Sequence, residues 1–506
     1  MGENYLFEPF KLLYERNETT MKTNISNQEK DKTTIEINTS DGNLKKEIIV
    51  SEQKIEKQYN YMKQIKALGE KRKYYINTMG CKLNENDSEK ISGMLSEMGY
   101  TQTENFEDAN VVVFNTCCIR ENAEEKVFGK LGELKRIKEK NNMIICFAGC
   151  MSQEPHVIEK IKKSYSQVDI IFGTHNLYKF PEMLYKKLNQ TKKVFEVWDI
   201  DGEIFEGLPI KREDKKSASV TIMNGCNNFC SYCIVPYTRG RERSRTPEEI
   251  LKEINNLAKE GYKEILLLGQ NVNSYQGKEN YNFANLLRDI NQIEGIEIIR
   301  FTSPHPKDFK DDVIEAIAEC EKVCKVIHLP LQSGSTAVLK SMNRKYSKEQ
   351  YLELVEKIRK RIPEAAFTTD IIVGFPGETE EDFKDTLDVV SKVGFEQIFM
   401  FIYSIRKGTR AETMPNHIPE SIKSERFNRL KQLADSLTEE ENFKYIGTIQ
   451  EVLVEGESKT NKDVLTARTR TNKVINFEGD KSLIGKTIKV KIISQHVWYL
   501  KGVIVK

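Results

Sequence analysis

From about residue 74 to residue 420, short β-branched or apolar runs alternate with longer amphipathic stretches. The runs have the length of strands and the stretches have the period of helices, so the pattern predicts βα units on parallel sheets. A polar, charged stretch at 209–216 ends the first block of units. The predicted strands of this block are 74–78, 111–115, 143–148 and 169–172, with helices near 86–98 and 122–139.

The second block runs from about 217 to 420 and contains six predicted βα repeats, too few for a complete eight-stranded barrel. A predicted helix at 421–444 then leads into a segment where apolar and charged residues alternate, as they do from Ile488 to Ile492. Such alternation is typical of strands with one buried face. The predicted strands of the second block are 219–223, 264–268, 296–300, 325–329, 369–373 and 397–401.

The first 70 residues are polar, with 11 basic and 12 acidic side chains and no sustained apolar period. A segment of this kind buries too little apolar surface to fold alone. We therefore predict a mostly disordered polar extension with at most one short helix over residues 1–70. The three folded domains are then expected at 71–210, 211–444 and 445–506.

The chain has 506 residues, with 78 Lys and Arg against 76 Asp and Glu, and a net charge of +2. This near-neutral charge excludes a basic field over the whole molecule, so any nucleic-acid contact has to be local. The last 61 residues carry a charge of +5 and the other 445 carry −3. The longest apolar runs fall short of the roughly 18 residues of a membrane span, and the start lacks the basic and apolar regions of a secretion signal. We expect a cytoplasmic protein without membrane contact.

Ten cysteines in a chain without a secretion signal point to metal or redox chemistry rather than to disulfides. Cys226, Cys230 and Cys233 form a C-x3-C-x2-C triplet directly after a predicted strand. Structural zinc is the alternative, but it needs four protein ligands, and the next Cys and His residues lie far away in the sequence. Three thiolates suit a 4Fe-4S cluster better, because such a cluster can keep one iron open for another ligand.

With the aromatic Tyr232 before its last cysteine, the triplet resembles the motif of the radical S-adenosylmethionine (SAM) enzymes, whose fold is a partial barrel. The resemblance implies that the three cysteines are catalytic and bind a 4Fe-4S cluster, whose open iron is chelated by SAM. An electron then cleaves SAM to a 5′-deoxyadenosyl radical, chemistry that no side chain can supply. Four positions at the ends of predicted strands also resemble SAM contacts, namely Gly269, Gln270, Asn271 and Asp370. The alternative is that these residues only form the turns that reverse the chain.

Three further cysteines, Cys81, Cys117 and Cys150, each follow a predicted strand of the first block by two or three residues. Because the carboxyl ends of parallel strands lie at one edge of a sheet, where open α/β sheets bind ligands, these thiols would converge. Three small buried residues are the alternative. Spacing alone leaves open whether the neighbouring Cys118 and Cys146 take part.

Residues 80–89 and 115–117 resemble the N-terminal domain of the radical SAM methylthiotransferases. That resemblance chooses Cys81, Cys117 and Cys150 and implies that they bind an auxiliary 4Fe-4S cluster with one open iron. The neighbouring Cys118 departs from the pattern of the family, as does the long N-terminal extension. Four cysteines remain without a role, namely Cys118, Cys146, Cys320 and Cys324. Cys320 and Cys324 are spaced i, i+4 in a helical pattern and could bind a metal, but we prefer to interpret all four as buried thiols.

The basic tail resembles the TRAM domain at 453–456, 466–472 and 485–490, which implies a small RNA-binding β-barrel with phosphate contacts. A solvated charged face is the alternative. Together with this resemblance, the chain is expected to be an α/β protein with an N-terminal parallel-sheet domain, a central partial (βα)6 barrel and a C-terminal β-barrel. The run from Arg239 to Arg245 adds a basic element near the triplet. The RNA-binding candidates in the tail are Arg468, Arg470 and Lys473.

Within the methylthiotransferases, residues 115–129 resemble the branch that modifies a prenylated adenosine. The resemblance implies methylthiolation of C2 of N6-dimethylallyladenosine, next to the anticodon of tRNA, with two SAM molecules and two 4Fe-4S clusters. Besides tRNA, the expected partner of this monomer is an electron donor protein. Two alternatives lie within the family, namely methylthiolation of threonylcarbamoyl adenosine in tRNA or of a ribosomal-protein aspartate. The alternative from another class is a non-enzymatic RNA-binding protein with structural zinc.

Overall fold

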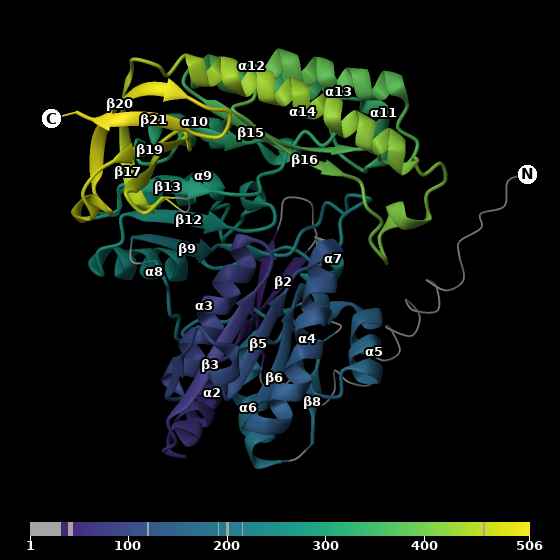
Figure 1. The fold of residues 1–506 in the computed structure, drawn as a ribbon, viewed down its shortest axis with the longest axis vertical. Helices are drawn as coiled ribbons and strands as arrows, with labels where there is room; N and C mark the ends of the chain where they lie inside the picture. Colours follow the sequence, from purple (N-terminus) through teal and green to yellow (C-terminus); the bar gives the residue numbers. More distant parts are fainter. Residues whose placement is uncertain are drawn as a thin grey trace, which may run out of the picture.

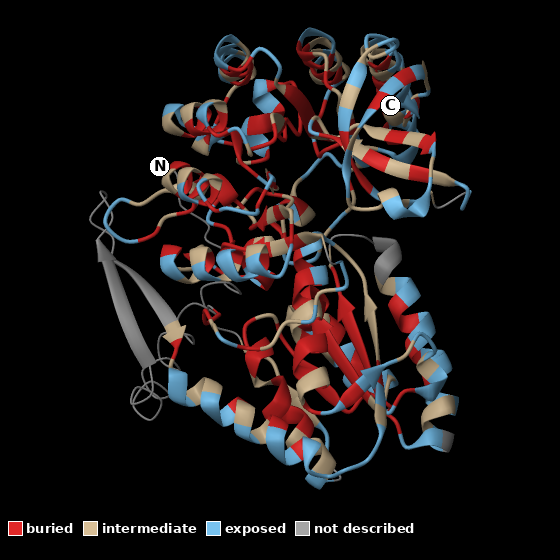
Figure 2. Cartoon of the chain, turned by 90° about the vertical axis from the view of Figure 1, so that its left-hand side faces the viewer, coloured by how far each residue is buried: buried red, intermediate tan, exposed pale blue. Residues whose placement is uncertain are grey.

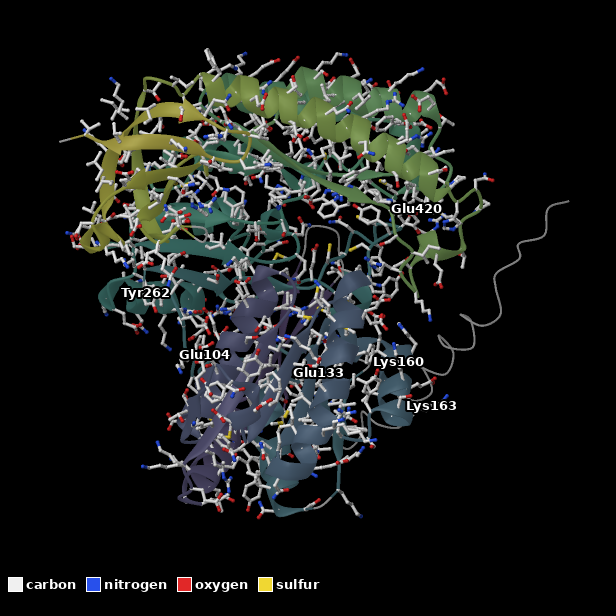
Figure 3. The ribbon with its side chains drawn as sticks, in the orientation of Figure 1. Glu104, Glu133, Lys160, Lys163, Tyr262 and Glu420 are labelled. Atoms are coloured by element: carbon white, nitrogen blue, oxygen red, sulfur yellow. The ribbon has the colours of Figure 1, made fainter. Side chains whose placement is uncertain are left out.

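The computed structural model describes residues 32–38, 44–118, 121–190, 192–198, 202–214, 216–458 and 461–505. The N-terminal sheet forms one half of the molecule, and the central and C-terminal units form the other (Figure 1). Buried residues gather inside each unit (Figure 2). Exposed charged side chains such as Glu104, Lys163 and Glu420 lie on the outside (Figure 3).

The N-terminal unit is built on a six-stranded parallel sheet in the order β4-β3-β5-β6-β7-β8. All six residues of β5 are buried, as a central strand covered on both faces requires. One apolar core contains residues of α2, α3 and α6, and a second contains residues of α4 and α5. The elements are β3 (Arg72–Thr78), β4 (Tyr100–Gln102), β5 (Val111–Thr116), β6 (Ile144–Gly149), β7 (Ile170–Phe172), β8 (Val194–Glu196), α3 (Lys82–Glu97), α4 (Glu121–Asn141), α5 (Pro155–Ser164) and α6 (Phe180–Asn189).

A helix that the sequence analysis assigned to the disordered extension belongs to this unit. β1 (Lys32–Asn38) pairs antiparallel with β2 (Leu44–Val50), and α2 (Glu52–Lys66) follows. Met62 and Ile65 of α2 are buried in the core shared with α3 and α6. The prediction for residues 1–70 allowed one short helix, and α2 has 15 residues; it did not anticipate the strands β1 and β2 or the packing of α2 on the N-terminal unit. Residues 1–31 and 39–43 lie outside the described residues.

The central unit has two three-stranded parallel sheets, β9-β12-β13 and β14-β15-β16, linked by a parallel bridge between Ile299 and Val323. Its six strands confirm the predicted partial barrel. Helices follow the strands and pack outside them. The elements are β9 (Ser217–Thr221), β12 (Glu264–Leu268), β13 (Ile298–Phe301), β14 (Val326–His328), β15 (Ala366–Val373), β16 (Gln397–Ile402), α8 (Pro247–Lys259), α9 (Phe283–Asn291), α10 (Asp311–Glu319), α11 (Thr336–Ser341), α12 (Lys348–Arg361) and α13 (Glu380–Val393), with the short β10 (Met223–Asn224), α7 (Val235–Thr238) and β11 (Arg243–Ser244) after β9.

The long helix α14 (Glu420–Phe443) leads into a closed barrel in the order β17-β18-β19-β21-β20. Alternate residues of its strands fill the interior, for example Val452 and Val454 of β17 and Val490 and Ile492 of β20, and this confirms the predicted C-terminal β-barrel. None of the described helices is long and apolar enough to cross a membrane. The strands are β17 (Ile449–Glu457), β18 (Val464–Thr469), β19 (Val474–Glu478), β20 (Thr487–Gln495) and β21 (Leu500–Ile504).

Candidate functional site

The cysteine triplet lies in the loop between β10 and α7. The loop turns at Gly225, whose φ is 80°, and a Cβ atom there would stand 1.9 Å from the carbonyl oxygen of Arg241. Only glycine fits such a turn without strain. Cys226 and Cys230 are each 9% exposed and Cys233 is half-buried. The sequence therefore folds the three thiols into one compact, mostly buried loop.

Polar donors face two sulfur atoms of the triplet. Asn228 Nδ2 lies 3.5 Å from the Sγ of Cys226, and Arg344 Nη1 lies 3.4 Å from the Sγ of Cys230. Burial raises the pKa of Cys226 to about 11 and that of Cys233 to about 12, so these thiols release their protons at neutral pH only when a cation binds. The donor set suits a cationic group held by thiolates.

The predicted SAM loop packs against the triplet loop. A Cβ atom at Gly269 would lie 2.6 Å from Cγ of Met223, so glycine permits a close approach. The backbone N–H of Gly225 donates to Oε1 of Gln270. Asn271 Nδ2 donates to Asp308 at 2.8 Å, while its Oδ1 is buried and has no partner among the described residues. That oxygen can accept a hydrogen bond from a ligand.

The second set of thiols gathers at the carboxyl edge of the N-terminal sheet. Cys81, Cys117 and Cys150 follow β3, β5 and β6. Asn84 Oδ1 lies 4.0 Å from Cys81 Sγ and 3.8 Å from Cys150 Sγ, and a Cβ at Gly80 would stand 3.0 Å from Cys117 Sγ. Three cysteines far apart in sequence are thus brought together at one end of the sheet.

The four remaining cysteines differ in their surroundings. Cys146 is fully buried in an apolar core, and burial raises its pKa. Cys118 lies beside the second thiol set, and the neighbouring Cys118 thiol lowers the pKa of Cys150. Cys320 and Cys324 are buried, but the predicted helix through both is wrong, because α10 ends at Glu319.

Within the described parts of the chain, groups of three or more His, Cys, Asp or Glu side chains able to hold a single metal ion do not occur. A structural zinc requires such a group around one ion. A 4Fe-4S cluster has different needs, because each cysteine binds a separate iron.

A large cavity of about 1090 Å³ opens inside the partial barrel. It is lined by alternate residues of the barrel strands, among them Phe399 and Phe401 of β16, which are 41% and 48% exposed. The predicted SAM contact Asp370 lies in this wall, with its Oδ2 3.3 Å from His328 Nε2. The remaining walls come from the N-terminal unit and the C-terminal barrel, for example Lys82 and Arg468. All three units therefore shape one cavity.

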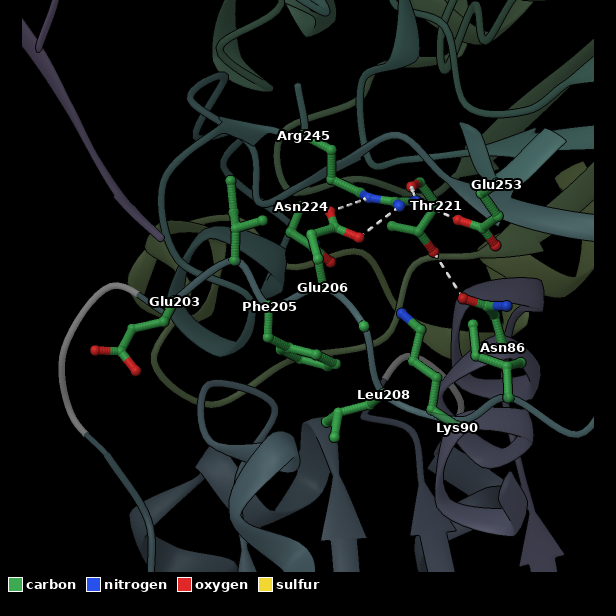
Figure 4. A pocket seen from close by; sticks show the side chains of 13 residues that line it. Asn86, Lys90, Glu203, Phe205, Glu206, Leu208, Thr221, Asn224, Arg245 and Glu253 are labelled. Carbon is green, nitrogen blue, oxygen red and sulfur yellow. Dashed lines mark hydrogen bonds and ion pairs between the residues drawn. The ribbon is translucent and has the colours of Figure 1, made fainter. Parts of the chain in front are cut away.

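The basic run after the triplet is mostly internal, and Arg241 is the exposed arginine among its four, so the run does not present the basic surface that would favour RNA. Arg239 and Arg243 are 5% and 9% exposed. Arg245 pairs with Glu206 at 2.5 Å and with Glu253 at 2.7 Å, beside a small pocket of about 50 Å³ between the units (Figure 4). Arg239 and Arg245 join the barrel to the N-terminal unit, whereas Arg243 donates to the carbonyl oxygens of Arg239 and Arg241 within the run.

The three RNA-binding candidates of the tail occupy different settings. Arg468 Nε donates to Glu455 Oε1 at 2.7 Å at the cavity wall, and the Arg470 side chain is 46% exposed. The Lys473 side chain is 11% exposed and pairs with Glu396. A lysine engaged inside the protein does not fit the predicted RNA contact.

Several residues that surround the thiols were not predicted from the sequence. Asn84 and Asp87 of α3 are buried although polar, at 0% and 7% exposure, and Arg344 reaches the triplet from the turn after α11. Polar residues spaced i, i+3 directly after Cys81 were the available signal for the first two. Arg344 has no such signal, because its contact depends on tertiary packing.

Family models match a part of each of the three units. Residues 220–390 match the model of the Radical SAM superfamily, residues 73–173 match the Uncharacterized protein family UPF0004 and residues 444–505 match the TRAM domain. The chain is 56% identical over 454 residues to the tRNA-2-methylthio-N(6)-dimethylallyladenosine synthase of Acetivibrio thermocellus, covering 89% of this chain and 94% of that protein. The protein of the same name from Clostridioides difficile is 52% identical over 474 residues, covering 91% and 99%.

One solved structure supports the fold. The radical S-adenosylmethionine methyltransferase TsrM from Kitasatospora setae, with cobalamin and a [4Fe-4S] cluster bound, is similar with a TM-score of 0.51. The match covers 68% of this chain and 77% of that chain at 14% sequence identity. At this identity the similarity extends to the fold alone.

Proposed function

Because the chain belongs to the family of the tRNA-2-methylthio-N(6)-dimethylallyladenosine synthases, we propose that it methylthiolates C2 of N6-dimethylallyladenosine next to the anticodon of tRNA. The observation that carries this proposal is the cavity of about 1090 Å³, which is walled by all three units. In this proposal the enzyme acts as a monomer.

We assign the six cysteines at the two thiol sets to two 4Fe-4S clusters. When bound, the cluster at the triplet would coordinate SAM and deliver the electron that cleaves it, and the auxiliary cluster would carry the sulfur to be transferred. The chain holds the first cluster through Cys226, Cys230 and Cys233. It holds the second through Cys81, Cys117 and Cys150. The electron has to come from a donor protein, and we place the enzyme in the cytoplasm with its tRNA.

The polar residues of the SAM loop orient the cofactor in this proposal. The buried, unpartnered Oδ1 of Asn271 would accept from the ammonium group of SAM. Gln270 holds the triplet loop through the backbone of Gly225, and Gly269 provides room for the close approach. Asp370 lies on the cavity wall near His328, and it remains a proposed contact to SAM.

The tRNA would enter from the cavity mouth. The adenosine beside the anticodon is single-stranded, so the base can be turned into a pocket at modest cost. Phe399 and Phe401 offer flat apolar faces for it, and Arg468 and Arg470 lie on the side of the C-terminal barrel where phosphates can be bound. These two arginines are our RNA-contact assignments.

Anaerobic turnover with SAM, a reductant and tRNA that carries N6-dimethylallyladenosine tests the proposal. We expect the 2-methylthio nucleoside in the hydrolysed tRNA by mass spectrometry. The Cys226→Ala enzyme should make neither product nor 5′-deoxyadenosine, whereas Cys81→Ala should still cleave SAM but insert no sulfur. Product from threonylcarbamoyl adenosine or a ribosomal-protein aspartate, with none from the prenylated tRNA, would contradict the proposed substrate.

A further inference from the structure

Arg239 crosses from the barrel into the auxiliary thiol set. It caps α7, the helix that begins two residues after Cys233, and its side chain is buried in the N-terminal unit. There, Nε lies 3.3 Å from Cys150 Sγ, Nη2 lies 2.7 Å from Asn84 Oδ1, and Nη1 lies 2.8 Å from Asp87 Oδ2. One side chain of the barrel thus contacts a thiol, an amide and a carboxylate of the other unit.

The three contacts use the planar fork of the guanidinium group, with each nitrogen facing a different partner. The compact ammonium group of a lysine could not reproduce them. Asp87 neutralises the buried charge, which would otherwise be costly. The carbonyl oxygen of Arg239 accepts a hydrogen bond of 3.1 Å from Arg243 Nη2, which fixes the other end of the residue in the barrel.

Asn84 extends the contact to the other two strand ends. Its Nδ2 donates to the carbonyl oxygens of Met79 at 2.9 Å and Thr116 at 3.0 Å. These carbonyls belong to the backbone just before Cys81 and Cys117. Arg239 is therefore connected, directly or through Asn84, to the segments that carry all three auxiliary thiols.

We propose that Arg239 is a positioning residue that raises the reduction potential of the auxiliary cluster and makes that potential depend on the docked barrel. This inference rests on the proposed function, because it takes Cys150 as a cluster ligand. Hydrogen bonds to cluster sulfurs, net charge and exposure set the potential of such clusters. A hydrogen bond from a cation to Cys150 stabilises the more negative, reduced state, and the Asp87 carboxylate acts in the opposite direction.

The test uses the full chain with Cys226, Cys230 and Cys233 changed to Ala, so that only the auxiliary cluster is titrated. An anaerobic redox titration followed by electron paramagnetic resonance compares this parent with added Arg239→Gln or Asp87→Asn. At a fixed potential, Arg239→Gln should lower the ratio of reduced to oxidised cluster at least tenfold, about 59 mV for one electron. Asp87→Asn should raise the ratio.

Arg241→Gln is the matched control, because Arg241 is exposed and lies over the Phe229 ring at 4.5 Å. The auxiliary cluster of this variant should have the same reduction potential as that of the parent. Unchanged potentials in both test variants would overturn the inference while leaving the proposed function intact. If Arg239→Gln bound no cluster, the reduction potential of Asp87→Asn would decide. A higher potential than that of the parent would support the inference, and an unchanged potential would overturn it. A parent without iron and sulfide would overturn the proposed function, and this inference with it.

Discussion

Lys473 Nζ donates a hydrogen bond of 2.7 Å to Asn442 Oδ1, which joins the turn between β18 and β19 to the end of α14. The same ammonium group pairs with Glu396, directly before β16. The side chains of Lys473 and Glu396 are 11% and 14% exposed, so both charges are largely removed from water. This lysine attaches the C-terminal barrel to the partial barrel.

Changing Lys473→Met should therefore lower the free energy of unfolding by about 1–3 kcal/mol, because it leaves Glu396 and Asn442 without their partner. Anaerobic denaturant unfolding measures the change. Lys491→Met is the comparison, since the exposed side chain of Lys491 on β20 should alter stability by less than about 0.5 kcal/mol. Unchanged stability with weaker tRNA binding in Lys473→Met would instead restore the RNA-contact role predicted from sequence.

Much of the fold could be predicted because burial imposes a period on the chain. β5 and β12 are nearly continuous apolar runs, as strands of covered parallel sheets must be. α2 was predictable in principle, since Ile55, Tyr59, Met62 and Ile65 are spaced as on one helix face. A high content of charged residues around them weakens the signal, and the helix is stabilised by packing on α6 and α3 rather than by its own composition.

The candidate site divides in the same way. The triplet at 226–233 is local, and parallel topology alone gathers the cysteines at strand ends. Arg239 and Lys473 could not be assigned from sequence, because their partners are chosen when the units dock. A run of arginines looks the same in sequence whether it faces solvent or an acidic partner such as Asp87. Positive charge therefore predicted an RNA contact where the structure has a domain interface.

Phe399 and Phe401 provide a test of the cavity as the substrate site. They lie two residues apart on β16 with their side chains partly exposed to the cavity. Stacking of a base on an aromatic ring contributes about 1–3 kcal/mol, so each change to Ala should weaken binding of the prenylated tRNA about tenfold or more. Filter binding at fixed salt measures it. Phe443→Ala, at the end of α14 and outside the cavity lining, should bind as the wild type does, and equal weakening there would refute the assignment.

His305 predicts an acid-sensitive stability. The ring is 6% exposed, and burial together with Arg344 and Lys307 lowers its pKa well below the ordinary value of 6.5. Below pH 6.5 the unfolded chain therefore binds a proton at this histidine that the folded chain does not bind. The contribution of His305 to the free energy of unfolding is fully present above pH 6.5, and it decreases by about 1.4 kcal/mol per pH unit as the pH falls below that value. Unfolding curves at pH 7.5, 6.5 and 5.5 measure this slope. His305→Gln should have a smaller slope, and an identical slope would exclude His305 as its source.

Cys117 and Cys118 are adjacent at the end of β5, and both lie at the auxiliary thiol set. The Cys117 side chain is 2% exposed and packs against Gly80, where a larger residue would collide with it. Cys118 instead lies toward α7, with its Sγ 4.0 Å from Thr238 Oγ1. The two thiols therefore point into different surroundings, although either could follow a strand as the sequence pattern requires.

Cys118→Ala should keep the iron and sulfide content of the wild type, because the three assigned ligands remain, whereas Cys117→Ala should lose the auxiliary cluster. Iron and sulfide are counted after anaerobic reconstitution in the background that has Ala at positions 226, 230 and 233. Cys146→Ala controls for the loss of any buried thiol in this unit, since Cys146 lies in an apolar core. If Cys117→Ala kept the full iron and sulfide content and Cys118→Ala lost it, the assignment would be reversed and Cys118 would be the ligand.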